Sequence, residues 1–258
     1  MNILIAPKPQ ESFSKAACTY DHFSALQQDI GLKIFEAIPE KLYPYILDIG
    51  MGTGWLTEKI AKKFPESKMV GLDYALGMVK KEKKRNIHFV LQADARKLPF
   101  KKEKFDLVVS NCAYQWVQDI PGAFCENARV LKPRGEFYFT CFGASTLKEL
   151  REALSKNVQG KPSELHHWHL LEKEKIRQAL ASAGFKDVKV ASQERTEYFK
   201  DLFDLLSWLK LIGANGAKRN IFVGRQLLAR ASRYYEDHFR SCDGIGATFE
   251  IIFGTARK

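Results

Sequence analysis

The sequence lacks any long hydrophobic run. Its strongest apolar stretches, such as 105–109 and 136–142, have the length of a β-strand and fall well short of the roughly 20 residues that a membrane-spanning helix needs. The first residues carry no basic segment ahead of a sustained apolar core, which argues against a secretory signal peptide. We therefore expect a cytoplasmic protein that does not enter a membrane.

Cysteine is scarce and unpatterned. The five cysteines include no Cys-x-x-Cys pair and their number is odd, which argues against a disulfide framework and a typical zinc site. Three histidines crowd into 166–169, but no cysteine or paired carboxylate lies near them. We expect free thiols in a reducing compartment and no bound metal.

Acidic residues are outnumbered. The 41 lysines and arginines exceed the 30 aspartates and glutamates, and the formal net charge is +11. Basic runs at 80–85 and 101–104 have no interleaved aromatic residues, which a groove for single-stranded nucleic acid would require. The charge indicates either a solvated basic surface or an acidic partner, protein or nucleic acid, without choosing between them.

Short apolar strands alternate with helical patterns along the chain. This alternation is typical of an α/β protein whose mostly parallel sheet carries helices on both faces. We expect one or two helices in 13–38, then seven strands at 45–49, 68–72, 87–92, 105–110, 135–142, 186–191 and 248–256. The intervening helices are expected at 54–64, 76–84, 119–131, 147–154, 172–183 and within 202–239.

The 258 residues fit a single domain, 1–258. Within it, the regular alternation predicts a ligand-binding core over 13–143. Two stretches depart from the alternation, 144–170 and 195–246, and we interpret both as insertions that cover the strand ends as a lid.

A glycine-rich turn follows the first expected strand. The segment reads Leu47-Asp-Ile-Gly-Met-Gly-Thr-Gly54, with Gly50, Gly52 and Gly54 in a G-x-G-x-G pattern. Glycines let the backbone turn sharply and approach a ligand where a Cβ would clash. Dinucleotide sites use G-x-G-x-x-G. Here Asp48 borders the turn instead, which suits a ligand with an ammonium group.

Two more carboxylates end the next two strands. Asp73 lies 19 residues after Gly54, where a carboxylate can bind ribose hydroxyls, and Asp94 can accept the exocyclic amine of adenine. Together with Asp48 they form a series at three consecutive strand ends, the edge at which open α/β sheets bind ligands. The series predicts recognition of an amine, a ribose and an adenine in turn.

These segments resemble the class I S-adenosylmethionine-dependent methyltransferases, which have a Rossmann-like fold. The resemblance covers about 13–142 and includes Gly71-Leu-Asp73, Phe105-Asp-Leu-Val-Val-Ser-Asn111 and Ala128-Arg-Val-Leu-Lys-Pro-Arg-Gly135. It implies that S-adenosylmethionine is the cofactor. The implied cofactor-binding residues are Tyr20, Asp48, Gly50, Gly52, Gly54, Asp73, Tyr74, Met78, Asp94, Ala95 and Asn111.

Within that superfamily the chain is similar to the malonyl-acyl-carrier-protein O-methyltransferases of biotin synthesis. The similarity rests on 13–21, on Asn111-Cys-Ala-Tyr-Gln-Trp116, on Lys210-Leu-Ile-Gly-Ala214 and on the closing segment 248–257. It departs from the usual pattern at Leu211, where glycine is expected, and in Ala75-Leu-Gly77, where serine and a different small residue are commoner. The similarity implies methyl transfer to the free carboxylate of a malonyl thioester on acyl carrier protein, an acidic partner that suits the positive charge.

This reaction needs no catalytic base, because a malonyl carboxylate is already an anion at pH 7. We therefore predict no certain catalytic residue. Trp116, Lys210 and Arg225 are the candidates for substrate binding: the aromatic ring for the sulfonium and the two cations for the carboxylate.

Three alternatives remain open. The first is another methyltransferase of this fold that acts on a quinone precursor or a small acid. The second, an RNA-binding methyltransferase, is disfavoured because Asn111-Cys-Ala-Tyr114 lacks the prolines typical of base-methylating enzymes. The third is a binding module that retains the cofactor pocket without catalysis.

Overall fold

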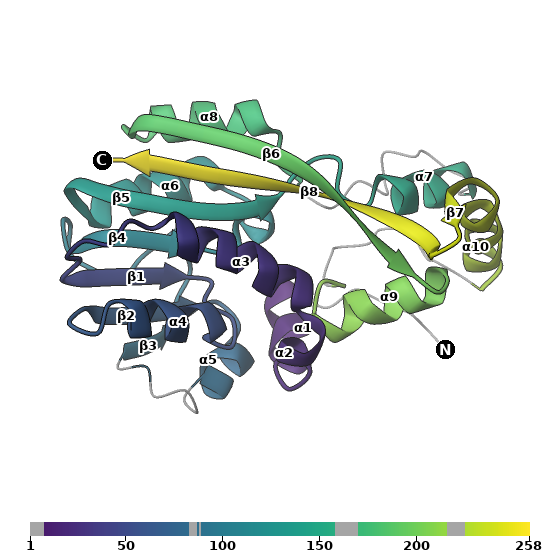
Figure 1. Cartoon of the computed structure of the whole chain (residues 1–258), viewed down its shortest axis with the longest axis horizontal. Coiled ribbons are helices and arrows are strands. Elements are labelled where there is room, and N and C mark those ends of the chain that lie inside the picture. The colour runs from purple at the N-terminus through teal and green to yellow at the C-terminus, as the bar shows by residue number, and fades with distance from the viewer. Residues whose placement is uncertain (1–7, 83–86, 88, 158–169, 216–224) are drawn as a thin grey trace.

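The computed structural model describes residues 8–82, 87, 89–157, 170–215 and 225–258. One sheet organises the chain, in the order β3-β2-β1-β4-β5-β8-β6, with β7 paired to β8 outside this path (Figure 1). The strands are β1 (Tyr45–Ile49), β2 (Lys68–Asp73), β3 (Phe89–Gln92), β4 (Phe105–Ser110), β5 (Leu131–Phe142), β6 (Lys186–Phe199), β7 (Arg240–Ser241) and β8 (Gly244–Arg257).

The described helices are more numerous at the N-terminus than the sequence pattern predicted. Three helices, rather than one or two, precede β1. The helices are α1 (Pro9–Ala16), α2 (Tyr20–Phe23), α3 (Ala25–Ala37), α4 (Trp55–Lys63), α5 (Leu76–Glu82), α6 (Ile120–Val130), α7 (Lys148–Asn157), α8 (Lys173–Ser182), α9 (Leu202–Leu211) and α10 (Arg225–Phe239), with a 3-10 turn, η1 (Tyr114–Trp116).

The first five strands run parallel, and β8 runs antiparallel to both β5 and β6. The mostly parallel α/β sheet was therefore predicted correctly, but it holds eight strands and not seven. The additional strand is the two-residue β7, whose Arg240 and Ser241 pair with Ile245 and Gly244 at the start of β8. A strand this short leaves no periodicity in the sequence.

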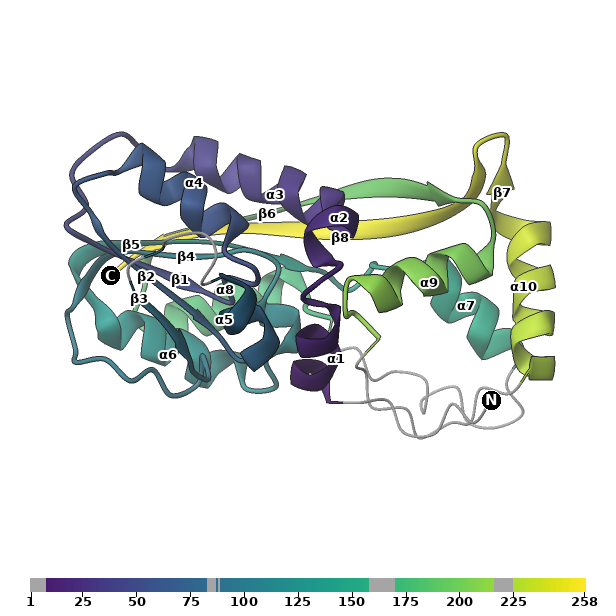
Figure 2. The ribbon, with the colours of Figure 1, turned by 90° about the horizontal axis from the view of Figure 1, so that it is seen from below.

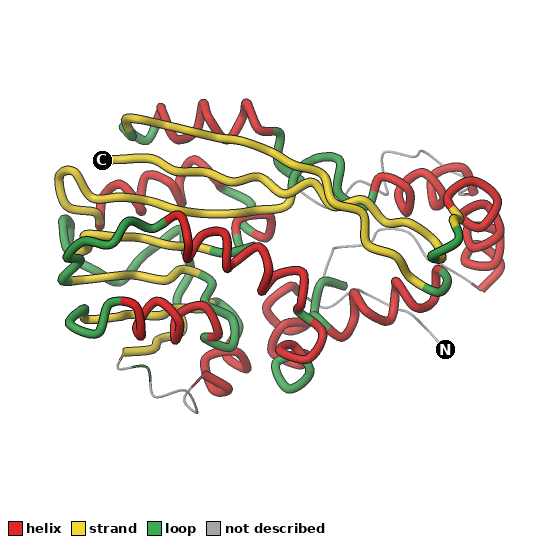
Figure 3. The backbone as a smooth tube through the Cα atoms, viewed as in Figure 1, coloured by secondary structure: helices red, strands yellow, loops and turns green. Residues whose placement is uncertain are grey.

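Strands β6 and β8 form a ribbon much longer than predicted, 14 residues each. Figure 3 shows them continuing beyond the rest of the sheet. Segment 192–197, which pairs with 247–252, is largely exposed on β6 and rich in polar residues. Backbone pairing with β8 keeps this segment in the sheet although it is not apolar. A prediction from apolar runs therefore ends the strand at 191, too early.

The helices α7, α9 and α10 pack at the far end of this ribbon and form what we call the distal lobe (Figure 2). The lobe has its own apolar cluster, in which Leu205 of α9, Tyr235 of α10 and Phe249 of β8 are almost fully buried. Separate clusters cover the two faces of the sheet. Between the end of β6 at Phe199 and the start of β8 at Gly244, the described chain forms α9, α10 and β7.

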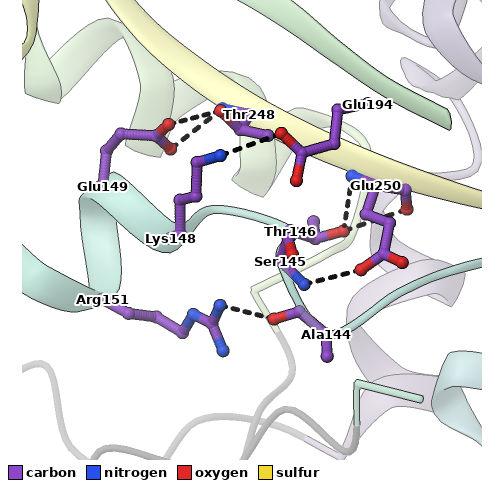
Figure 4. A network of polar contacts seen from close by, with 9 residues as sticks. All are labelled: Ala144, Ser145, Thr146, Lys148, Glu149, Arg151, Glu194, Thr248 and Glu250. Atoms are coloured by element: carbon purple, nitrogen blue, oxygen red, sulfur yellow. Dashed lines mark hydrogen bonds and ion pairs between the residues drawn. The ribbon is translucent and has the colours of Figure 1, made fainter. Parts of the chain in front are cut away.

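Carboxylates fasten the start of α7 to the ribbon (Figure 4). Buried Glu149 accepts hydrogen bonds from the backbone N–H of Thr248, at 2.9 Å, and from its hydroxyl. Glu250 accepts from the backbone N–H of Ser145 at 2.8 Å, and Lys148 pairs with Glu194 at 2.9 Å. These contacts link the distal lobe to both long strands.

The helix α1 lies directly on α5. The backbone N–H of Gly77 donates to the Ser14 hydroxyl at 3.1 Å, and a Cβ on Gly77 would lie 2.3 Å from the Ser14 carbonyl oxygen. This contact leaves no room for a side chain at position 77. No described helix is long and apolar enough to cross a membrane.

Candidate active site

A cavity of about 380 Å³ opens at the carboxyl ends of the parallel strands. Its walls are drawn from the N-terminal segment 8–20, the glycine turn 49–52, and the segments 72–78, 93–96 and 111–118 that follow β2, β3 and β4. Both its size and its position are those of a ligand site in an open α/β fold.

Most residues that the sequence predicted for the site meet at this cavity. Ten of them contribute to its walls: Tyr20, Gly50, Gly52, Asp73, Tyr74, Met78, Asp94, Ala95, Asn111 and Trp116. Asp48 and Gly54 lie outside the walls. Lys210 and Arg225 are exposed residues of the distal lobe and also do not line the cavity.

The glycine turn has the geometry that its sequence predicts. Gly50, Gly52 and Gly54 all have positive φ, at 72°, 59° and 83°. A Cβ on Gly50 would lie 2.4 Å from the Cβ of Ala113. Gly54 occupies the N-cap of α4 instead of the cavity wall. The missing side chains therefore leave the turn open toward the cavity and close to the loop after β4.

Asp73 combines a structural contact with an open position on the cavity wall. Its carboxylate accepts from the backbone N–H of Gly52 at 2.9 Å and of Ala75 at 2.7 Å. Burial raises the pKa of Asp73 to about 6, against the effect of these hydrogen bonds. Each oxygen can accept a second donor, such as the hydroxyls of a ribose.

Asp48 lies deeper than the sequence suggested. It is 1% exposed, and its Oδ2 accepts from the Thr57 hydroxyl at 2.6 Å, whereas Oδ1 has no hydrogen-bond partner. Burial raises the pKa of Asp48 to about 7. A buried carboxylate oxygen without a hydrogen-bond partner fits a site for a positively charged group.

Asp94 is held by a neighbour that the sequence argument missed. The Arg96 guanidinium donates to the Asp94 carboxylate from Nε at 3.0 Å and from Nη2 at 2.6 Å. This pairing holds the pKa of Asp94 below its usual range. Arg96 also lines the cavity. The only sequence signal for its role was a cation two residues after the carboxylate.

The N-terminal helices close one side of the cavity. The Tyr20 ring lies over Gly52, since a Cβ there would be 3.9 Å from Tyr20 Cε1. The next residue, Asp21, accepts a hydrogen bond from the hydroxyl of Thr53 in the glycine turn. Phe13 is a second residue that the sequence argument did not place in the site. Its ring packs edge-on against that of Trp116, with 5.1 Å between the ring centroids.

Asn111 is fixed at the carboxyl end of β4. Its Nδ2 donates to the carbonyl of Gln27 on α3 at 2.8 Å, and its Oδ1 accepts from the Thr140 hydroxyl at 2.7 Å. Cys112 follows with a positive φ of 50°. Burial raises the pKa of the Cys112 thiol to about 12, and the thiol is therefore neutral at physiological pH.

The described part of the chain contains no group of three or more metal-ligating side chains that could hold an ion. The histidines at 166–169 lie outside the described residues. The cavity instead offers polar contacts for a nucleoside, and the buried carboxylate of Asp48 lies outside its walls.

Fold and site together define a class I S-adenosylmethionine-dependent methyltransferase. Residues 47–139 match the methyltransferase domain family. YcgJ of Bacillus subtilis aligns with a TM-score of 0.64 and 19% identity, over 90% of this chain and 98% of that one. A Haemonchus contortus phosphoethanolamine N-methyltransferase in complex with S-adenosylmethionine aligns with a TM-score of 0.62 and 20% identity, over 95% and 57%.

Two curated relatives identify the particular family. A malonyl-[acyl-carrier protein] O-methyltransferase of Geobacter sulfurreducens is 33% identical over 97% of this chain and 98% of its own length. A protein of the same name from a Methylovorus strain is 35% identical over 96% and 88%. The chain belongs to the malonyl-[acyl-carrier protein] O-methyltransferase family.

Proposed function

We propose that this enzyme transfers the methyl group of S-adenosylmethionine to the free carboxylate of a malonyl thioester on acyl carrier protein, an early step of biotin synthesis. Near-full-length relatives that carry this name support the substrate. The observation that carries the proposal is the cavity in which the glycine turn, Asp73 and Asp94 meet at adjoining strand ends.

Each part of the cofactor has a matching part of the cavity. We assign the methionine end to Gly50 and Gly52, with the charge of Asp48 behind them, and the ribose hydroxyls to Asp73. The adenine falls to Asp94 and the Ala95 amide. Tyr74 and Met78 supply apolar contact to the nucleoside, and Met78 is 1% exposed. Tyr20 and Asn111 border the methyl end.

When bound, S-adenosylmethionine supplies a methyl group on a positively charged sulfur. A malonyl carboxylate can attack that methyl without losing a proton, because its pKa lies well below 7. The neutral Cys112 thiol is therefore not required as a base. Burial also raises the pKa of the Tyr20 hydroxyl, so that it stays protonated and can only donate or accept hydrogen bonds.

The protein's main contribution is alignment and the exclusion of water. The Phe13 and Trp116 rings meet at the cavity and provide apolar walls beside the methyl end. We infer that the distal lobe acts as the lid over the acyl chain. The excess of positive charge suits an acidic carrier protein in the cytoplasm, through steering of the encounter.

The test is methyl transfer to malonyl-acyl carrier protein, followed by intact mass. Free malonate, acetyl-acyl carrier protein, a small panel of phenolic acids and bulk RNA serve as alternative acceptors. A gain of one methyl on the malonyl-carrier protein alone is expected. Methylation of the phenolic acids or RNA instead would overturn the proposed substrate and leave the cofactor assignment standing.

A further inference from the structure

Arg96 forms a two-pronged contact with the Asp94 carboxylate inside the cavity wall. Nε donates to Oδ1 at 3.0 Å and Nη2 to Oδ2 at 2.6 Å, with a longer Nε contact to Oδ2 at 3.2 Å. The backbone N–H of Arg96 also donates to Oδ1, at 2.9 Å. One residue thus holds the carboxylate from its main chain and its side chain at once.

These bonds determine what the carboxylate can still accept. A carboxylate has about four lone-pair sites, two on each oxygen. Nε carries a single hydrogen, and its shorter contact is to Oδ1, so that Oδ1 accepts two donors from Arg96 while Oδ2 accepts the Nη2 donor. The free acceptor position is therefore on Oδ2, and Arg96 fixes the direction in which it points.

We propose that Arg96 is a positioning residue for adenine recognition. Its two-pronged guanidinium contact, which we call the fork, orients Asp94 so that the remaining Oδ2 lone pair receives the exocyclic amine. This inference rests on the assignment of Asp94 to the adenine. Because only that one acceptor remains, the arrangement selects a donor at this position of the base. A 6-oxo base, which presents an oxygen there, meets electrostatic repulsion instead.

The fork also offsets the cost of covering the carboxylate. Side-chain exposure is 29% for Asp94 and 42% for Arg96, and a bound base would remove Asp94 further from water. Covering a lone carboxylate is unfavourable, whereas a bidentate guanidinium partner reduces that penalty. Lysine cannot reproduce the two parallel bonds, since it presents a single point of charge.

The local turn does not depend on the guanidinium. The backbone N–H of Lys97 donates to the Asp94 carbonyl at 3.0 Å, and the Arg96 N–H reaches Oδ1 without help from the side chain. An Arg96→Met substitution therefore keeps the turn and removes only the fork. The neighbouring Lys97 is exposed and does not line the cavity, so Lys97→Met removes the same charge one residue away as a control.

The experiment is a double-mutant cycle on the binding of S-adenosylhomocysteine, measured by calorimetry without turnover. Arg96→Met is expected to weaken binding about tenfold, as is typical for loss of a charge-assisted pair, and Arg96→Lys to fall in between. In an Asp94→Asn background the same Arg96→Met change should have almost no effect. Lys97→Met should match the parent protein.

The outcomes separate the two assignments. If Asp94→Asn itself binds normally, the placement of adenine at Asp94 is wrong. If Asp94→Asn weakens binding but Arg96→Met does not, or the two effects simply add, then Arg96 does not act through Asp94. The 6-oxo analogue, S-inosylhomocysteine, is the second probe. The parent protein should prefer the adenine form, and Arg96→Met should reduce that preference severalfold.

Discussion

The carboxylate of Asp73, at the end of β2, accepts a hydrogen bond from the backbone N–H of Gly52 at 2.9 Å. The residue assigned to the ribose therefore also holds the turn assigned to the methionine end. A single substitution at β2 consequently affects both halves of the cofactor site.

Asp73→Ala is expected to weaken the binding of S-adenosylhomocysteine by tenfold to hundredfold, roughly the effect of leaving buried donors unpaired. The backbone N–H groups of Gly52 and Ala75 lose their acceptor, and the ribose loses its own. Calorimetry measures the affinity. Glu66→Ala, at an exposed acidic position, is the control, and equal affinity in both variants would contradict the assignment.

Asp48→Asn should stabilise the cofactor-free protein at pH 8. Because the pKa of Asp48 is raised to about 7, the folded state binds more protons than the unfolded state between about pH 4 and 7. The free energy of unfolding therefore falls as the pH rises through that range. Asparagine avoids this penalty and can still accept from Thr57.

The expected gain is on the order of 2 kcal/mol at pH 8 and smaller at pH 5, with weaker binding of S-adenosylhomocysteine at both. Chemical denaturation at the two pH values measures the stability. If the variant is instead less stable than the parent at pH 8, then the protein stabilises the ionised Asp48 carboxylate more than the unpartnered Oδ1 indicates.

Gly50→Ala should damage the protein more than Gly184→Ala. Both glycines have positive φ, 72° and 86°, so both substitutions strain the backbone by about 1 kcal/mol. A Cβ on Gly50 also meets Ala113 at 2.4 Å, whereas one on Gly184 meets nothing within 4 Å. We therefore expect Gly50→Ala to lower the free energy of unfolding by about a further 1–3 kcal/mol, and thermal unfolding measures the difference. Equal losses would mean that the loop after β4 can move away.

Asp21→Ala is expected to weaken S-adenosylhomocysteine binding several-fold, while Asp21→Asn retains most of it. Asp21 accepts from the Thr53 hydroxyl and so connects α2 to the glycine turn, which places the adjacent Tyr20 over Gly52. Asparagine keeps an acceptor oxygen and alanine does not. Failure of asparagine to restore binding would indicate that the charge, and not the acceptor, matters.

The parallel sheet and the cofactor edge could be predicted from the sequence because both depend on local signals. Strands β1 and β4 were predicted with their observed bounds, since buried parallel strands are continuous apolar runs. The carboxyl ends of parallel strands share one edge of the sheet. The positions of Asp73 and Asp94 at the ends of two successive strands were therefore enough to predict that the two residues lie close together, and both line the cavity.

Only the tertiary structure decided what surrounds those residues. The burial of Asp48, the fork of Arg96 and the exposed positions of Lys210 and Arg225 depend on where side chains point once distant segments pack. The length of the β6–β8 ribbon likewise comes from backbone pairing across more than 40 residues of intervening chain, roughly the separation of Phe199 and Ile245. Hydrophobic periodicity in the sequence predicts the local secondary structure and the buried face of an element, but it does not predict which other segment packs against that face.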